Sequence, residues 1–365
     1  MIATQALREV GQGIWLDFIT RRLLAEGTLQ HYIDELGVTG LTSNPTLFYQ
    51  AISRGNDYDD SLRAGRERGL RGEGLFFQLA LEDLTRAAAL FQPIHHQTQG
   101  EDGWVSLEVS PLLAWQPVPT LEQVLTLHAR ASLSNLFIKI PGTHAGLRAI
   151  EEATYAGVPI NVTLLFSAEQ YLAAANAYMR GIERRLQDGL SPDVRSVASL
   201  FVSRWDKAVQ GKVPELLRNR LGLAVAQRTY RAYCALRASR RVQHLESEGA
   251  SMQKLLWAST GTKDPTAPDT LYVESLAAPD TIDTMPEGTL LAFADHGTVE
   301  QVMARDGGDC ERVIAEFVAA GVDVDALAEQ LQREGAESFS KSWRDLMAVI
   351  SEKREALEEG HGVVR

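Results

Sequence analysis

Short apolar runs with strand character alternate with longer helical segments along most of the chain, and this alternation constrains the fold more than any other feature. Strands that alternate with helices pair in parallel through right-handed crossovers. The predicted strands are Ile14–Asp17, Val38–Asn44, Trp104–Ser110, Leu136–Ile140, Ile160–Phe166, Ser196–Val202, Leu255–Thr260 and Leu271–Leu276. The predicted helices include Thr20–Leu36, Phe76–Phe91, Thr120–Ala131, Gly142–Ala156 and Ala168–Leu186. The chain is therefore predicted to be an α/β protein with a parallel sheet.

Eight strands are predicted, and eight is the number of parallel strands that closes a (β/α)₈ barrel. An open doubly wound sheet is the alternative. Polar residues within the strands favour the barrel. Ser106, Glu108 and Ser110 share one face of their strand, and Asn161 and Thr163 share one face of theirs. Strands of a sheet that helices cover on both faces read as almost continuously apolar, whereas the inside of a barrel can be polar at its mouth.

One barrel domain is expected to span residues 1–365, since α/β barrels routinely form single domains of more than about 200 residues. Residues 300–365 are predicted to form C-terminal helices that pack on or over the barrel. One helical stripe there carries Phe339, Trp343, Leu346, Met347 and Ile350. Docking on the outside of the barrel explains such a stripe, and a helix that caps the mouth is the sharper hypothesis.

The balance of charge limits the classes of partner. Lysine and arginine total 36 against 48 aspartate and glutamate, a net charge of −12, which argues against a nucleic-acid surface. Two cysteines are too few for a disulfide framework or a zinc cluster. The sequence shows neither a secretion signal nor an apolar run long enough to span a membrane. We therefore expect a cytoplasmic protein with small-molecule partners, no nucleic acid and no membrane, as a monomer or a homodimer.

One lysine stands out by its surroundings. Only seven of the basic residues are lysines, and Lys139 alone lies within a dense apolar strand. A buried ammonium is costly unless it is paired or neutralised, and a neutral amine can form a Schiff base with a carbonyl. A lysine that reaches solvent from the strand end, or one that pairs with a carboxylate, is the structural alternative.

Other polar residues stand at the ends of the predicted strands: Asp17, Asn44, Glu108, Asn161 and Thr163. Each could be a cap or a turn residue by itself. In a barrel, however, these strand ends converge on the C-terminal mouth, where active sites of this fold lie. Together with Lys139 they predict a site that processes a carbonyl with acid and base groups.

A phosphate site is predicted beside them. The loop after the seventh predicted strand, Ser259–Lys263, offers hydroxyls, a glycine and a cation, and Arg204 follows the sixth strand. Barrels often bind phosphate in the loops after strands seven and eight.

Several segments resemble the signatures of the transaldolase family, in the long-form subfamily of the class I Schiff-base aldolases. They occur in family order and span roughly residues 9–350. The segments are Ile14–Asp17, Gly37–Thr46, Val105–Pro111, Leu136–Thr143, Pro159–Ser167 and Ser199–Asp206. The resemblance implies a (β/α)₈ barrel that needs neither a metal nor an organic cofactor.

The resemblance also implies a role for each matching residue. Lys139 corresponds to the Schiff-base lysine, Asp17 to the group that moves the proton of a substrate hydroxyl, and Glu108 with Thr163 to the pair that holds a catalytic water. The positions that match substrate-binding residues are Asn44, Asn161, Ser199, Phe201, Arg204 and Ser259. The loop after Ser259 departs from the shorter members of the family, which carry an arginine there. This chain has Thr260–Lys263 in that loop, and we expect Lys263 to contact the phosphate.

The implied reaction transfers a dihydroxyacetone unit from sedoheptulose 7-phosphate or fructose 6-phosphate to glyceraldehyde 3-phosphate or erythrose 4-phosphate, in the non-oxidative pentose phosphate pathway. One alternative is cleavage that releases free dihydroxyacetone, as a fructose-6-phosphate aldolase does. A catalytically silent barrel that serves as a binding module is another. A silent barrel should have lost Lys139, Asp17 or Glu108, and this chain retains all three.

Overall fold

The computed structural model describes residues 2–359, and within them eight parallel strands close into a barrel in sequence order, with β1 beside β8. The strands are β1 (Gln12–Asp17), β2 (Gly40–Thr42), β3 (Val105–Glu108), β4 (Leu136–Pro141), β5 (Ile160–Leu165), β6 (Ser196–Phe201), β7 (Lys254–Ala258) and β8 (Thr281–Met285). The predicted (β/α)₈ barrel is confirmed, and the open sheet was the wrong alternative.

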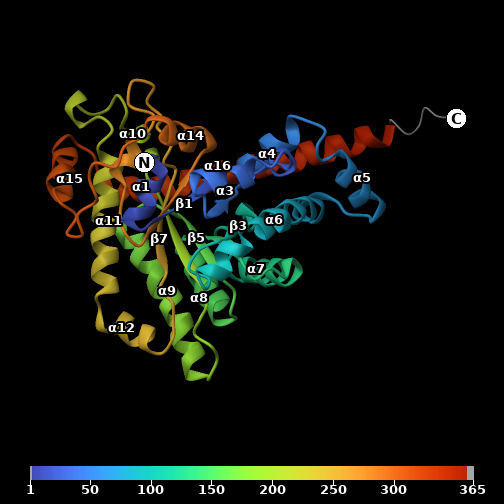
Figure 1. Cartoon of the computed structure of the whole chain (residues 1–365), viewed down its shortest axis with the longest axis horizontal. Helices are drawn as coiled ribbons and strands as arrows, with labels where there is room; N and C mark the ends of the chain where they lie inside the picture. Colours follow the sequence, from blue (N-terminus) through green and yellow to red (C-terminus); the bar gives the residue numbers. More distant parts are fainter. Residues whose placement is uncertain (1, 360–365) are drawn as a thin grey trace.

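Helices surround the barrel and extend beyond it (Figure 1). They are α1 (Ala3–Val10), α2 (Arg21–Ala25), α3 (Thr28–Leu36), α4 (Pro45–Ser53), α5 (Asp59–Glu67), α6 (Gly72–Gln97), α7 (Pro117–Ala131), α8 (Gly146–Tyr155), α9 (Ala168–Gln187), α10 (Ser203–Val209), α11 (Leu221–Arg237), α12 (Arg240–Ser247), α13 (Leu271–Ser275), α14 (Glu287–His296), α15 (Cys310–Ala319) and α16 (Val324–Glu359), with short 3₁₀ turns at η1 (Pro111–Leu113) and η2 (Glu215–Leu217). Among residues 2–359, no helix combines the length and the apolar character that a membrane crossing requires.

The eighth strand was predicted in the wrong place. Leu271–Leu276 was expected to be a strand, but its first five residues form the short helix α13, and the strand β8 lies ten residues later. The sequence of β8 is mostly polar, which hides it from a search for apolar runs. Its Asp283 is fully buried and accepts a hydrogen bond from Thr260 Oγ1 (2.8 Å), so a partner on the neighbouring chain segment replaces apolar character.

Two smaller differences have local causes. The predicted helix Thr20–Leu36 is divided into α2 and α3 at Gly27, whose φ of 76° lies in the left-handed region. The charged stretch Arg63–Glu73 reads from the sequence as a surface connection, but α5 covers its first five residues, including Gly65. A Cβ at Gly65 would lie 2.3 Å from Leu75 Cδ1, so the glycine lets α5 pack closely on α6.

Aromatic side chains fill the barrel at the N-terminal ends of its strands. The rings of Trp104 and Phe137 stack with centroids 4.1 Å apart, and Trp15 stacks on Phe137 at 6.1 Å. A Cβ at Gly40 would lie 2.5 Å from the Trp15 ring, so this position on β2 has no room for a side chain. The barrel is thus a packed core at this end rather than a pore.

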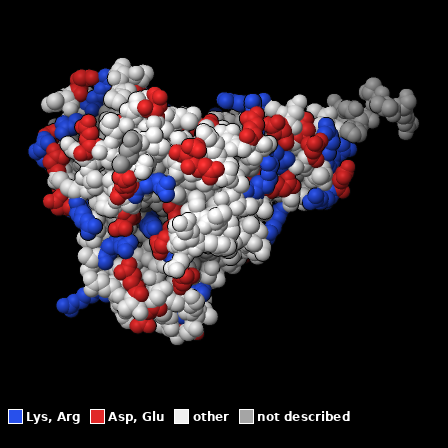
Figure 2. Space-filling model, in the orientation of Figure 1, with Lys and Arg blue, Asp and Glu red and all other residues white. Residues whose placement is uncertain are grey.

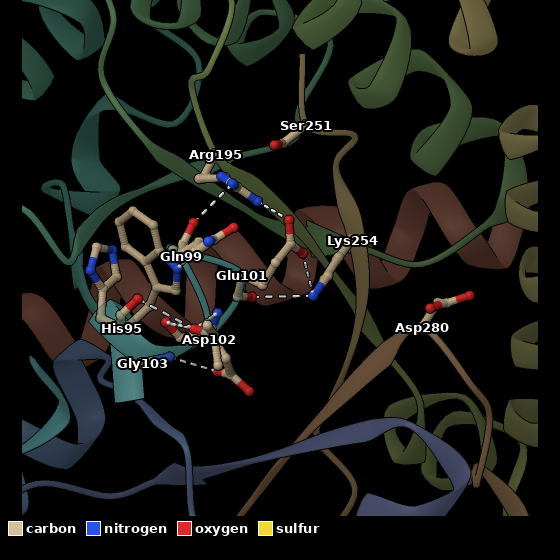
Figure 3. A network of polar contacts seen from close by, with 12 residues as sticks. His95, Gln99, Glu101, Asp102, Gly103, Arg195, Ser251, Lys254 and Asp280 are labelled. Carbon is tan, nitrogen blue, oxygen red and sulfur yellow. Dashed lines mark hydrogen bonds and ion pairs between the residues drawn. The ribbon is translucent and has the colours of Figure 1, made fainter. Parts of the chain in front are cut away.

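A polar network closes the same end (Figure 3). The Asp102 carboxylate accepts a hydrogen bond from Trp15 Nε1 (2.8 Å), which fixes the orientation of that ring. Nearby, Arg195 and Lys254 both pair with Glu101, and the distance from Lys254 Nζ to Glu101 Oε2 is 2.8 Å. These groups hold β3, β6 and β7 together at the N-terminal end, so the polar residues at the opposite end are the candidates for chemistry.

The last helix, α16, joins the barrel to a projecting group of helices. It contacts β5 and η1 at the barrel and continues beside α4, α5 and α6 (Figure 1). These three helices are called the helical arm. Phe339 and Trp343 of α16 itself are buried, and Trp343 packs on Phe76 of α6 with ring centroids 4.9 Å apart. Residues 360–365, which belong to the predicted C-terminal segment, lie outside the described residues.

Charged side chains of both signs are interspersed over the barrel and the helical arm on the face shown in Figure 2. Ion pairs between charged side chains of the protein include Arg241 Nε with Glu183 Oε1 (2.6 Å) and Arg180 Nε with Glu151 Oε2 (2.6 Å). Exposed pairs of this kind contribute little to stability. The charges that bear on function are those gathered at the strand ends.

Candidate active site

The amine of Lys139 lies inside the barrel. Its residue is only 5% exposed, and its Nζ donates a hydrogen bond to the backbone carbonyl of Ser43 (3.2 Å). Nζ also lies 3.5 Å from Glu108 Oε2, because the strand register places Glu108 on β3 beside Lys139 on β4. The side chain therefore does not extend to bulk solvent, and its carboxylate partner is one of the predicted acid/base groups.

Glu108 is placed to exchange a proton near neutral pH. Burial raises its pKa to about 7, while the neighbouring charge of Lys139 opposes the rise and that of Asp17 adds to it. Its two carboxylate oxygens have no hydrogen-bond partner among residues 2–359. A carboxyl group with these properties suits general acid and base catalysis.

Asp17 ends β1 on the other side of Lys139. Burial raises its pKa, and the Lys139 charge and a hydrogen bond from Thr42 oppose the rise. The Thr42 hydroxyl donates to Asp17 Oδ1 (2.8 Å) and lies 2.7 Å from the Thr284 hydroxyl of β8. A hydroxyl pair thus fixes the carboxylate so that one of its oxygens can face a substrate.

Asn44 has two roles in the structure. Its Oδ1 accepts a hydrogen bond from Leu47 N (3.1 Å) and so caps α4, which is the local role that the sequence left open. Its side chain also lies close enough to the Asp17 carboxylate to oppose the rise in that residue's pKa. The cap therefore orients an amide toward the same carboxylate.

Three buried polar residues form the wall beyond Lys139. Ser199 Oγ donates to Asn161 Oδ1 (2.7 Å), and Asn161 Nδ2 donates to Ser106 Oγ (3.2 Å). These bonds fix the orientation of the Asn161 amide beside Lys139, its register neighbour on β4. Thr163 lies on the same face of β5, and its buried Oγ1 has no hydrogen-bond partner in the described part of the chain. That hydroxyl is available to a water or a substrate.

Cations gather at one side of the mouth. The guanidinium of Arg204 lies over the rings of Phe201 (5.5 Å) and Phe339 (5.8 Å). Burial lowers the pKa of Lys263, and the charges of Arg204 and Lys207 lower it further. Positive charges held together in this way create a favourable position for an anion.

The loop that carries Lys263 is firmly anchored. The next residue, Asp264, accepts hydrogen bonds from Arg218 Nε (2.6 Å), Arg218 Nη2 (2.7 Å) and Asn219 Nδ2 (2.8 Å). At the start of the loop Ser259 has a φ of 57°, and its hydroxyl lies 3.0 Å from that of Ser203 on α10. This geometry holds Ser259 and Lys263 on the Arg204 side of the mouth.

The predicted site residues occupy different positions along the strands. Asp17, Glu108 and Phe201 end their strands, Lys139, Ser199 and Thr163 lie within theirs, and Asn161 is the second residue of β5. Asn44, Arg204, Ser259 and Lys263 lie in the segments that follow strands. Sequence reasoning missed Lys207, Thr284 and Gln332. Lys207 could have been found from its position three residues after Arg204 on a short helix. Thr284 was missed because β8 was misplaced, and Gln332 carries no local signal.

Comparison with known proteins gives the family. A family model described as Transaldolase/Fructose-6-phosphate aldolase matches residues 14–350. A protein named Transaldolase from Saccharopolyspora erythraea is 40% identical over 357 residues, which are 96% of this chain and 97% of that protein. One of the same name from Neisseria gonorrhoeae is 38% identical over 345 residues, 94% and 98% of the two chains. One from Thermobifida fusca is 40% identical over 358 residues, 96% and 97%. The chain therefore belongs to the transaldolase/fructose-6-phosphate aldolase family.

Proposed function

We propose that this protein is a transaldolase that moves a dihydroxyacetone unit from a ketose phosphate to an aldose phosphate through a Schiff base on Lys139. The observation that carries the proposal is the buried Lys139 amine, which lies 3.5 Å from a carboxyl group whose pKa is about 7. The similarity over nearly the whole chain to proteins named Transaldolase supports the same activity. We further propose that it acts in the cytoplasm, in the pentose phosphate pathway.

The first half of the reaction forms the iminium. The Glu108 carboxylate takes a proton from the Lys139 ammonium, the freed amine attacks the ketone carbon, and the resulting carbinolamine loses its hydroxyl as water. Glu108 supplies the proton for this loss, and Thr163 holds the water with it. The iminium then attracts electrons from the neighbouring carbon–carbon bond.

The second half breaks and remakes a carbon–carbon bond. Asp17 removes the proton from the substrate hydroxyl, the carbon–carbon bond breaks, and its electron pair moves to the iminium as an enamine forms. The aldose phosphate leaves with the new carbonyl group. Asn44 and Asn161 hold the hydroxyls of the three-carbon unit until a second aldose phosphate arrives, and the same steps then run in reverse.

Binding of the phosphate is assigned to the cations at the mouth. Arg204 offers a planar fork of donors that suits a phosphate, and Lys263 adds a second charge. Ser259 contributes a hydroxyl and Phe201 the apolar wall beneath Arg204. This end of the site would select phosphorylated sugars such as sedoheptulose 7-phosphate and fructose 6-phosphate.

Net cleavage with release of dihydroxyacetone is the second candidate, because the family description includes fructose-6-phosphate aldolase. The position of α16 supports transfer, since Phe339 lies beside Phe201 (6.5 Å between ring centroids), where its ring would limit the access of water to the enamine. The silent-barrel alternative requires the loss of catalytic groups that this chain retains.

The test is an exchange assay that measures both outcomes at once. With fructose 6-phosphate and erythrose 4-phosphate together, we expect sedoheptulose 7-phosphate and glyceraldehyde 3-phosphate in equal amounts. With fructose 6-phosphate alone, we expect little free dihydroxyacetone. Rapid release of dihydroxyacetone in the second reaction would favour the aldolase, and no turnover in either reaction would favour the silent barrel.

A further inference from the structure

The C-terminal helix reaches the strands of the site through one buried amide. Gln332 of α16 is only 8% exposed, and its Nε2 donates to the backbone carbonyls of Gly142 (3.1 Å) and Leu164 (2.9 Å). An amide nitrogen carries two hydrogens, so these two bonds use its whole donor capacity. A side chain distant in sequence thus ties together the ends of β4 and β5.

Both carbonyls belong to segments that carry predicted catalytic residues. Gly142 directly follows β4, the strand of Lys139, and its own N–H donates to Thr163 O (2.7 Å). Leu164 directly follows Thr163. The Gln332 amide therefore binds the carbonyl of the residue next to Thr163.

The segment that it holds is irregular. Leu164 has a φ of 59°, which is unusual for a residue with a branched side chain, and the pairing of β5 with β6 shifts register between Val162 and Leu165. Residues in such conformations persist only where the surrounding structure holds them. Gln332 provides a donor for the carbonyl that this distortion presents.

The helix fits closely against the same segment. One turn after Gln332, a Cβ at Gly335 would lie 2.9 Å from Leu164 Cδ2 and 3.7 Å from Phe166 Cε2. The absence of a side chain at Gly335 thus lets α16 approach β5 closely enough for the Gln332 amide to reach both carbonyls. The contact is specific in shape as well as in hydrogen bonding.

We propose that Gln332 is a positioning residue, which holds the distorted end of β5 so that the Thr163 hydroxyl faces Glu108 and Lys139 during formation and hydrolysis of the Schiff base. This inference rests on the proposed function, because it concerns the water that Thr163 and Glu108 hold there. Without the amide, two buried carbonyls lose their donor, and the segment would relax to recover other partners.

The test compares Gln332→Met, which keeps the side-chain size but has no donor, with Gln330→Met. Gln330 is exposed on the same helix, where its amide donates to Glu334 (2.7 Å). We expect kcat for exchange to fall on the order of 10- to 100-fold in Gln332→Met, as a displaced catalytic group would give. The KM for the ketose phosphate should change little, because Arg204 and Lys263 keep their positions. Gln330→Met should behave as the parent.

Two further variants separate positioning from general stability. Gln332→Glu has no donor when ionised but regains one when protonated, so its kcat relative to the parent should rise as the pH falls, whereas that of Gln332→Met should not. Combining Gln332→Met with Thr163→Val should give no greater loss than Thr163→Val alone, because both act through one hydroxyl. Losses that multiply in the double variant, or an unchanged kcat in Gln332→Met, would overturn the inference.

Hydrogen exchange keeps this test independent of the activity. Gln332→Met should speed amide exchange in the segment of residues 160–166, and Gln330→Met should not. A parent protein without exchange activity would refute the proposed function alone. An unchanged rate of amide exchange in Gln332→Met would refute the positioning role, whatever the activity.

Discussion

Lys139 and Glu108 are neighbours across two parallel strands, and the amine nitrogen of the first lies 3.5 Å from a carboxylate oxygen of the second inside the barrel. The pair places a nucleophile next to a group that can give and take a proton near neutral pH. A Schiff-base mechanism requires both functions at one carbon atom.

The pKa of Glu108 predicts a pH dependence. Because the pKa is about 7, the carboxyl group is protonated below that pH and can supply the proton that iminium formation needs. We therefore expect the rate of iminium formation to fall as the pH rises through about 7. Glu108→Gln should lower this rate by about 10²–10⁴-fold and remove the titration near pH 7. Single-turnover measurements between pH 5 and pH 9 check this, and a titration that survives in Glu108→Gln would assign it to another group.

The buried Asp283 predicts a pH dependence of stability rather than of activity. Burial raises its pKa to about 7, and its hydrogen bond from Thr260 opposes the rise. As the pH rises from about 4 to about 7, the unfolded chain releases this proton while the folded protein retains it, so the folded state loses stability. The loss amounts to a few kcal/mol, because a tenfold change in proton affinity corresponds to about 1.4 kcal/mol.

Asp283→Asn tests this prediction, because the amide can still accept from Thr260 but cannot ionise. The midpoint temperature of thermal unfolding, measured from pH 4 to pH 8, should fall less steeply with pH in Asp283→Asn than in the parent. Parallel curves for the two proteins would contradict the raised pKa.

Misplacement of β8 illustrates what sequence patterns miss. Seven strands were found because their outward faces are apolar. The Lys139–Glu108 pair could be anticipated from a lone lysine in an apolar strand and from the polar face of the strand that carries Glu108. Asp283 is buried through a hydrogen bond to Thr260, which lies in another segment. No pattern local to β8 reports a partner that only the closed barrel brings near.

Gln332 was unpredictable for a related reason. In sequence it resembles Gln330, two residues earlier on the same amphipathic helix, yet one is buried against two carbonyls and the other is exposed. The difference depends on where α16 crosses the barrel. That crossing is set by contacts with the helical arm, such as those of Trp343 with Phe76, rather than by the helix itself.

Arg204 is expected to bind the phosphate of the substrate. Arg204→Ala should raise the KM for phosphorylated donors by about tenfold or more, as the loss of a charge-assisted hydrogen bond would. Turnover of unphosphorylated donors of dihydroxyacetone should remain nearly unchanged. Arg312→Ala on the exposed face of α15 is the control. Equal losses on both kinds of donor would instead indicate that Arg204 maintains the shape of the barrel.

Phe339 is expected to protect the enamine from water. It lies over Arg204 (5.8 Å) and beside Phe201 at the mouth, so Phe339→Ala should increase release of dihydroxyacetone relative to transfer. A single substitution is a sharper test than truncation of α16 after Gly335, which would also remove the contact of Trp343 with Phe76 in the helical arm. The product ratio should stay constant in Lys341→Ala, an exposed neighbour on the same helix. An unchanged ratio in Phe339→Ala would exclude this role.

The central claim is that Lys139 becomes covalently bound to the ketose substrate. Borohydride added together with fructose 6-phosphate should reduce the iminium and inactivate the protein irreversibly. Peptide mass mapping should then locate a three-carbon or six-carbon adduct on Lys139 and on no other lysine. An adduct on Lys263, or exchange activity that survives in Lys139→Ala, would contradict the account.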